Sequence, residues 1–139
     1  MKVFLYYIGK QKDPHANAMA EDYMKRADRY ASSTMAEIRP DRTDFWSKHP
    51  TAKKILLDPA GKPLDSHAFA EMFRKGEMLG HDLVFVVGGH DGHSDEWRQR
   101  ADMLVSLSAM TMPHELARAV LAEQIYRAFT ILRGHPYPR

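Results

Sequence analysis

The sequence contains no cysteine among its 139 residues, which excludes disulfide bridges and thiolate metal ligands. It also has no apolar run near the ~20 residues that a membrane-spanning helix needs. The apolar run at residues 3–8 is short and lacks the small-residue cleavage site of a signal peptide. Repeats, low-complexity tracts and Gly/Ser linkers are absent as well. We therefore expect a cytoplasmic protein, not attached to a membrane, that folds as a single domain over residues 1–139.

The sequence has little excess of charge of one sign, because its formal net charge is only +2. Hydrophobic residues make up 44% and charged residues 27%, which is typical of a globular fold. Non-specific affinity for nucleic acid grows with the number of phosphates that a protein neutralises. A chain this balanced therefore needs a local basic patch, a second subunit or a structured target if it is to bind RNA.

Strand and helix patterns alternate along the chain. Short β-branched or apolar runs predict strands, helical spacing of apolar residues predicts helices, and Ser66 and Ser94 are expected to cap two of these helices. The Pro- and Gly-rich residues 58–63 predict a turn, and the polar residues 39–51 predict a loop. We expect strands at 2–8, 34–38, 54–57, 83–87 and 103–107, and helices at 14–30, 66–80, 94–100 and 113–132. This order favours an α/β fold with a mostly parallel sheet flanked by helices.

The last predicted helix is apolar on more than one side. One stripe is widened by a second, whereas a surface helix needs only one. The most economical interpretation is a homodimer interface. The two stripes consist of Leu121, Ile125, Ala128 and Leu132, and of Val120, Ala122, Tyr126 and Phe129.

Three predicted strand ends carry unusual sequence, at residues 57–63, 88–92 and 106–114. Ligands in open α/β sheets bind beyond the carboxyl ends of the strands. Gly88 and Gly89 would let a ligand approach the backbone closely. The uncharged residues 106–112 suit a flat, neutral group such as adenine. Each segment also has a plainer interpretation, as a tight turn or as a buried strand and turn.

The residues also raise two other possibilities, a metal site and a hydrolytic site. His90, Asp91 and His93 lie close together, and His81 and His114 are further possible zinc ligands. Their spacing is not that of a helical ligand pair, so we expect no metal site. A hydrolytic set of Ser108, His114 and Asp91 is also disfavoured, because no nucleophile-elbow motif is present.

The C-terminal segment 133–139 is stiffened by two prolines. It combines Arg133 and Arg139 with His135 and Tyr137. Arginine suits phosphate and aromatic rings suit stacking on bases, so the segment is a candidate RNA-contacting tail. Because it follows the last helix, we expect it to pack little core. A frayed, solvated end is the plainer alternative.

Four ordered motifs resemble the bacterial large-subunit rRNA (pseudouridine-N3)-methyltransferase family of the SPOUT superfamily. They are LDPAGKP at 57–63, FVVGGHDG at 85–92, SLSAMTMPHELARAVLAEQIYRAF at 106–129 and RGHPY at 133–137. The resemblance covers about residues 55–139. It implies a SPOUT-type sheet with a C-terminal trefoil knot, a rare exception to unknotted topology.

The resemblance further implies an enzyme that methylates N3 of a pseudouridine in 23S ribosomal RNA, as a homodimer and within the ribosome. S-adenosyl-L-methionine is the implied cofactor. Its contacts are expected at Leu57, Gly88, Leu107, Ser108, Ala109, Met110, Thr111 and Met112. Alternatives are a SPOUT enzyme acting on tRNA or another rRNA position, and a cofactor-binding module without catalysis.

An imide N–H is a poor nucleophile until it is deprotonated, so the implied reaction needs a base or a group that stabilises the anion. The catalytic candidates are His135, Tyr137 and Arg139 on the tail. His90 and Asp91 at the glycine turn are alternatives. Because the tail follows the last helix, it is placed to act on the active site of a partner subunit.

Overall fold

A computed structural model describes residues 1–138 of the chain. All strand pairs in its five-stranded sheet are parallel, and the strand order is β2-β1-β4-β3-β5. The strands are β1 (Val3–Ile8), β2 (Ser33–Ile38), β3 (Lys53–Pro63), β4 (Leu83–Val87) and β5 (Met103–Ser106). This arrangement confirms the predicted α/β class. The knotted chain path stays a prediction.

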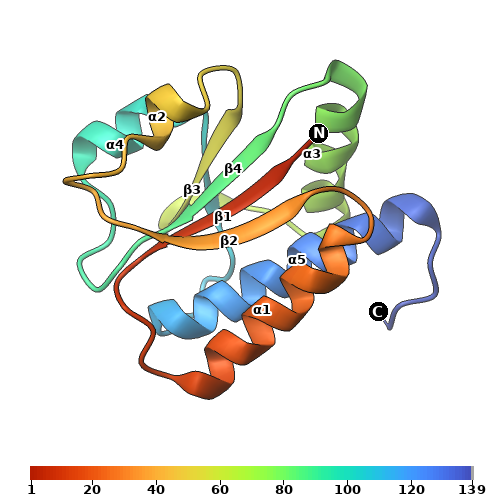
Figure 1. The fold of residues 1–139 in the computed structure, drawn as a ribbon, viewed down its shortest axis with the longest axis horizontal. Coiled ribbons are helices and arrows are strands. Elements are labelled where there is room, and N and C mark those ends of the chain that lie inside the picture. Colours follow the sequence, from red (N-terminus) through yellow and green to blue (C-terminus); the bar gives the residue numbers. More distant parts are fainter. Residues whose placement is uncertain (139) are drawn as a thin grey trace.

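Helices cover both faces of the sheet (Figure 1). One layer holds α1 (Pro14–Asp28), α3 (Ser66–Leu79) and α5 (His114–Arg133), and the other holds α2 (Phe45–Lys48) and α4 (Asp95–Arg100). Within the described residues, none of these helices combines the length and the apolar composition needed to cross a bilayer.

The alternation of side chains along each strand divides the core in two. Leu5 and Phe85 belong to the larger cluster beneath α1, α3 and α5, whereas Tyr6 and Val86 belong to the smaller cluster beneath α2 and α4. Every residue of β4 is buried. This is why its sequence is continuously apolar, as expected for a central strand of a parallel sheet.

Side-chain caps fix where four helices begin, and at α2 the Asp44 carboxylate accepts from Ser47 N. The carboxylates of Asp13 and Asp65 accept hydrogen bonds from the first turns of α1 and α3, and the Ser94 hydroxyl accepts one from Trp97 N. The predicted Ser94 cap is therefore confirmed. The Ser66 cap is wrong, because Ser66 is already helical and its hydroxyl donates to Gln124.

Two predicted irregular segments differ in the structure. Residues 39–51 contain the short helix α2, whose Phe45 is buried beneath the sheet. Residues 58–63 do not reverse the chain, because β3 continues to Pro63. Both Leu57 and Lys62 pair with Val105, so the intervening residues bulge out. A Cβ on Gly61 would lie 2.6 Å from the Leu104 backbone, so only glycine allows β3 to approach β5 this closely.

The last helix buries its wide apolar surface within a single chain. Leu121, Ala122, Ile125 and Phe129 are 0% exposed, because α1, α3 and the sheet surround α5. The interpretation of this surface as a dimer interface is therefore wrong for these four residues, whereas Val120 and Leu132 of the same stripes are partly exposed. The homodimer itself stays a prediction that needs another surface.

Candidate functional site

A cavity of about 390 Å³ opens at the carboxyl ends of β3, β4 and β5. We call it the strand-end cavity. Its volume lies in the range of small-molecule sites, and its position follows the rule for open α/β sheets. All eight residues predicted to contact the cofactor line it, namely Leu57, Gly88, Leu107, Ser108, Ala109, Met110, Thr111 and Met112.

The glycine turn after β4 forms one wall of the strand-end cavity. The turn closes through a hydrogen bond from Gly92 N to Gly89 O at 3.1 Å. A Cβ on Gly88 would lie 3.2 Å from Gly92 Cα and 3.3 Å from the His93 ring. A side chain at Gly88 would therefore press on the turn as well as on any ligand that approaches this wall.

Two serines shape the opposite wall, which follows β5. The Ser106 hydroxyl donates to Ser108 O at 3.0 Å, and the Ser108 hydroxyl accepts from Met110 N at 2.9 Å. These local bonds hold residues 106–110 in a turn. The side chain of Met110, 79% exposed, projects from this wall at the cavity. Neutral side chains of this kind suit a flat, uncharged ring.

Charge is sparse around the strand-end cavity. Among the described residues that line it there is no lysine or arginine, and its one carboxylate, Asp58, is 3.0 Å from the guanidinium of Arg98. His93 packs behind Gly88 and contacts Val86 O at 3.2 Å through Nε2. Burial lowers the pKa of His93, so its imidazole is neutral near pH 7. A ligand that carries a positive charge meets no lysine or arginine among the described residues of these walls.

The list of expected cofactor contacts left out several residues of the cavity wall. Asp58 and Pro59, in the predicted strand end 57–63, reach it where β3 bulges. His114, in the predicted segment 106–114, and Ala117, outside all three segments, reach it from the first turn of α5. Their place directly after the neutral loop was the available signal. His90 lines the cavity too, as its position in the glycine turn suggested.

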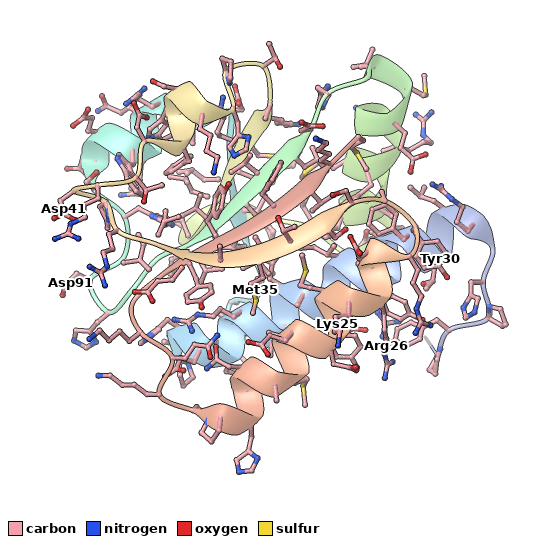
Figure 2. All side chains as sticks on the ribbon, viewed as in Figure 1. Lys25, Arg26, Tyr30, Met35, Asp41 and Asp91 are labelled. Atoms are coloured by element: carbon pink, nitrogen blue, oxygen red, sulfur yellow. The ribbon has the colours of Figure 1, made fainter. Side chains whose placement is uncertain are left out.

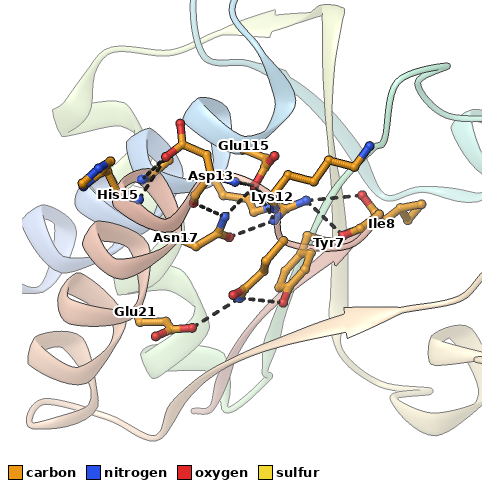
Figure 3. Close-up of polar contacts among 12 residues, drawn as sticks. Tyr7, Ile8, Lys12, Asp13, His15, Asn17, Glu21 and Glu115 are labelled. Atoms are coloured by element: carbon orange, nitrogen blue, oxygen red, sulfur yellow. Dashed lines mark hydrogen bonds and ion pairs between the residues drawn. The ribbon is translucent and has the colours of Figure 1, made fainter.

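The first turn of α5 is anchored by a buried polar network (Figure 3). The guanidinium of Arg118, 0% exposed, donates to Asn17 Oδ1 at 2.9 Å and to Gly9 O at 3.2 Å, and it lies over the ring of Tyr7. Glu115 lies 3.8 Å from the same guanidinium. Because His114 and Ala117 share this turn, the network also holds one wall of the strand-end cavity.

Glu115 fastens the loop between β1 and α1 to this turn. Its Oε2 accepts from Asp13 N at 3.0 Å, from Lys12 N at 2.9 Å and from the Asn17 amide at 2.6 Å. The two backbone N–H groups, more than the nearby Arg118, lower the pKa of Glu115 to about 2. The carboxylate is therefore ionised throughout the physiological range.

The tail lies at the opposite end of α5 from the strand-end cavity. Tyr137 is not frayed: its ring meets the Tyr126 ring edge-on at 4.8 Å between centroids, and its hydroxyl donates to Glu123 at 2.9 Å. The expectation that the tail packs little core is therefore wrong for Tyr137. His135 is exposed, and Arg139 lies outside the described residues.

Burial and the hydrogen bonds with Tyr23 and Glu123 raise the pKa of Tyr137. In this position its phenol stays protonated and acts as a hydrogen-bond donor. His135 lines a second cavity of about 760 Å³ together with Lys25, Arg26 and other residues of α1 and α5. Figure 2 shows Lys25, Arg26 and Tyr30 at one end of the molecule and Asp91, in the glycine turn, at the other.

The histidines considered as zinc ligands are not assembled into a metal site. Within residues 1–138, no group of three histidine, aspartate or glutamate side chains is arranged to hold a metal ion. His93 is turned toward Val86 O, and His114 lies near Gly9.

Comparisons with known proteins agree with this geometry. A family described as "Predicted SPOUT methyltransferase" matches residues 1–138. A "Ribosomal RNA large subunit methyltransferase H" from Solibacter usitatus is 70% identical, over 100% of both chains.

Solved structures share the fold at low identity. A probable methyltransferase from Bordetella pertussis superposes with a TM-score of 0.62 at 11% identity, over 92% of this chain and 96% of that chain. A putative methyltransferase from Legionella pneumophila, in complex with the bound cofactor SAM, gives 0.55 at 13% identity, over 90% and 65%. With its family match along residues 1–138 and a relative 70% identical over the full length, the chain belongs to the SPOUT methyltransferase family.

Proposed function

We propose that this chain is an S-adenosylmethionine-dependent methyltransferase that methylates N3 of a pseudouridine in the 23S ribosomal RNA of the large subunit. The observation that carries the proposal is the strand-end cavity, a neutral pocket whose walls come from three strand ends. Membership of the SPOUT methyltransferase family and the full-length relative named a large-subunit rRNA methyltransferase support the reaction class.

The strand-end cavity fits the cofactor by its chemistry. When bound, S-adenosylmethionine supplies a methyl group made electrophilic by a sulfonium. Leu57, Gly88 and residues 107–112 would hold the cofactor between the two walls. The absence of lysine and arginine from the described lining avoids repulsion of the sulfonium, and exposed backbone groups at the strand ends can read the adenine edge.

The chain must also activate the nucleophile. A pseudouridine imide loses its N3 proton before or during methyl transfer, so a base or an anion-stabilising group has to lie beside the cavity. His90 lines the cavity and Asp91 follows it in the same exposed turn. Both are activating groups that a single chain offers close to its own pocket.

The tail belongs to a different pocket. The 20 residues of α5 separate the tail from the strand-end cavity, and a helix of this length spans about 30 Å. The tail is therefore too far from the strand-end cavity of its own chain, and it can reach only the cavity of a second copy. This geometry supports a homodimer in which each tail adds its side chains to the partner's active site.

Within such a dimer the tail residues have different roles. Tyr137, protonated where it lies, serves as a donor or a stacking ring and not as the base. Its bond with Glu123 must break if the ring is to reach a substrate. We assign proton removal to His135 and phosphate binding to Arg139, while a large-subunit ribosome supplies the RNA substrate.

Methyl incorporation from radiolabelled S-adenosylmethionine tests the proposal. Purified protein is incubated in parallel with ribosomes, isolated 23S rRNA and tRNA from cells that lack the modification. We expect label in 23S rRNA. Label in tRNA alone would show that the substrate is a different RNA. Cofactor binding without methylation of any of the three RNAs would show that the chain is a non-catalytic cofactor-binding module.

A further inference from the structure

We propose that the larger of the two cavities binds backbone phosphates of the RNA substrate. We call it the basic cavity, and it is lined by Lys25, Arg26, Arg29, Tyr30, Tyr126 and His135, with Asp22 at its edge. The inference rests on the proposed function, because it names the part of the chain that holds the RNA while the methyl group is transferred.

Positive charge is concentrated in the basic cavity. Three cationic side chains and one carboxylate line it, an excess equal to the formal net charge of +2 of the whole chain. The rest of the sequence is therefore balanced overall. A local basic patch is what so balanced a chain needs in order to bind a polyanion.

Two of the three cations are available to a ligand. Arg26 is 2.9 Å from Asp22, its neighbour one turn back on α1, and lies over the rings of Tyr23 and Tyr126. In the described part of the chain, Lys25 and Arg29 form no ion pair. Both are exposed, and because the C-cap residue Arg29 keeps helical backbone angles, their spacing of four residues places them on one side of the end of α1.

Helix stability alone does not account for this arrangement. Cations near the C-terminus of a helix interact favourably with its dipole, which explains a positive last turn of α1. It does not explain why these cations border a cavity of about 760 Å³ with an aromatic wall. Tyr30 is stacked on Phe129 with ring centroids 5.8 Å apart, so its ring is held in place by the core.

The chemistry of the lining selects a phosphate-bearing ligand. A sulfonium cofactor would be repelled by Lys25 and Arg29, whereas phosphate is attracted, and a rigid tyrosine ring offers stacking for a neighbouring base. RNA carries both groups on one chain. The position supports the same ligand, because His135 of the tail lines this cavity. If the tail reaches a partner's active site, the basic cavity therefore lies close to that site as well.

Measured RNA affinity tests this inference in the full-length protein. The double variant Lys25→Gln with Arg29→Gln removes both unpaired cations. The matched control, Lys62→Gln with Lys75→Gln, removes two exposed lysines that line neither cavity. Binding to 23S rRNA is followed across a salt series, together with binding to S-adenosylmethionine and sedimentation.

We expect the Lys25/Arg29 variant to bind rRNA about 10-fold or more weakly and to lose about 0.7 to 0.9 of the salt slope per cation. Cofactor affinity and sedimentation should match the control. Equal RNA affinity and slope in both variants would overturn the inference, as would a wild type that does not bind rRNA. A change of oligomeric state in the test variant alone would also overturn it, because a second copy of the chain would then cover the cavity.

The wild-type methylation assay separates this inference from the proposed function. If the wild type methylates rRNA and the two variants bind RNA equally, only the basic cavity has been misassigned. If the wild type binds rRNA but transfers no methyl group, the proposed function fails. The comparison of the two variants then still decides whether this cavity holds phosphate.

Discussion

Ala117 is a residue through which the strand-end cavity can be closed. It lies in the first turn of α5, is partly exposed and lines the cavity, whereas its neighbour Leu116 is 45% exposed and does not line it. Ala117→Phe should fill cofactor space and weaken S-adenosylmethionine binding by about 10-fold or more, equivalent to ~1.4 kcal/mol. Calorimetry measures the affinity, and Leu116→Phe is the control. Equal affinity in the two variants would remove the cofactor from this cavity.

Glu115 allows a test of the network that holds the same helical turn. Its folded pKa of about 2 lies below the ordinary 4.5, so its ionised form stabilises the fold above about pH 4.5. This stabilisation is lost as the pH falls from 4.5 toward 2. Glu115→Gln should therefore be less stable than the wild type at pH 7, with a gap that narrows at pH 3. Urea unfolding at both pH values measures it, and a gap independent of pH would contradict the assignment.

The two ends of α5 are expected to serve different steps, cofactor binding at its first turn and methyl transfer at its tail. The first turn of α5 lines the strand-end cavity and the tail lies at its other end. A truncation after Leu132 should keep cofactor affinity but lose most methyl transfer. It should also lower the Tm by a few degrees, roughly 2–4 °C, because Tyr137 no longer packs on Tyr126. Single-turnover assays and calorimetry measure both effects; full turnover in the truncated chain would assign activation to His90 and Asp91.

The elements themselves were largely predictable from local signals. Apolar runs such as Leu83–Val87 and caps such as Ser94 act over a few residues, and the structure confirms them. The bulge at residues 58–61 was not predictable, because its cause is the pairing of both Leu57 and Lys62 with Val105, far along the chain. The wide apolar surface of α5 was misread for a similar reason. Periodicity shows that a surface is buried, but not whether another helix or another subunit covers it.

Of the two cavities, the strand-end cavity was predictable from the sequence and the basic cavity was not. Strand ends, glycines and the neutral loop at 107–112 indicated one cavity, because parallel strands place their carboxyl ends along one edge. The basic cavity was not found, since its cations are interleaved with the apolar positions that define α1 as a helix. The spacing of Asp22, Lys25, Arg26 and Arg29 on α1 was the signal that was available.

For the whole molecule, the separation of tail and cavity predicts complementation between two defective chains. Ala117→Phe carries a blocked cavity and an intact tail, and the chain truncated after Leu132 carries the reverse. Neither should methylate rRNA alone, whereas a mixed dimer contains one complete active site. Co-refolding the two should restore a substantial part of wild-type activity. No recovery, with mixed dimers demonstrated by a tag on one chain, would contradict an active site shared between subunits.

The central claim, methylation of N3 of a pseudouridine in large-subunit rRNA, is tested most directly on the nucleosides themselves. Ribosomes that lack the modification are incubated with the protein and S-adenosylmethionine carrying a heavy methyl group, and their 23S rRNA is digested for mass spectrometry. We predict a heavy-labelled nucleoside that co-elutes with 3-methylpseudouridine and is absent with Ala117→Phe. A labelled nucleoside of any other identity, or no labelled nucleoside from a wild-type protein that binds the cofactor, would contradict the account.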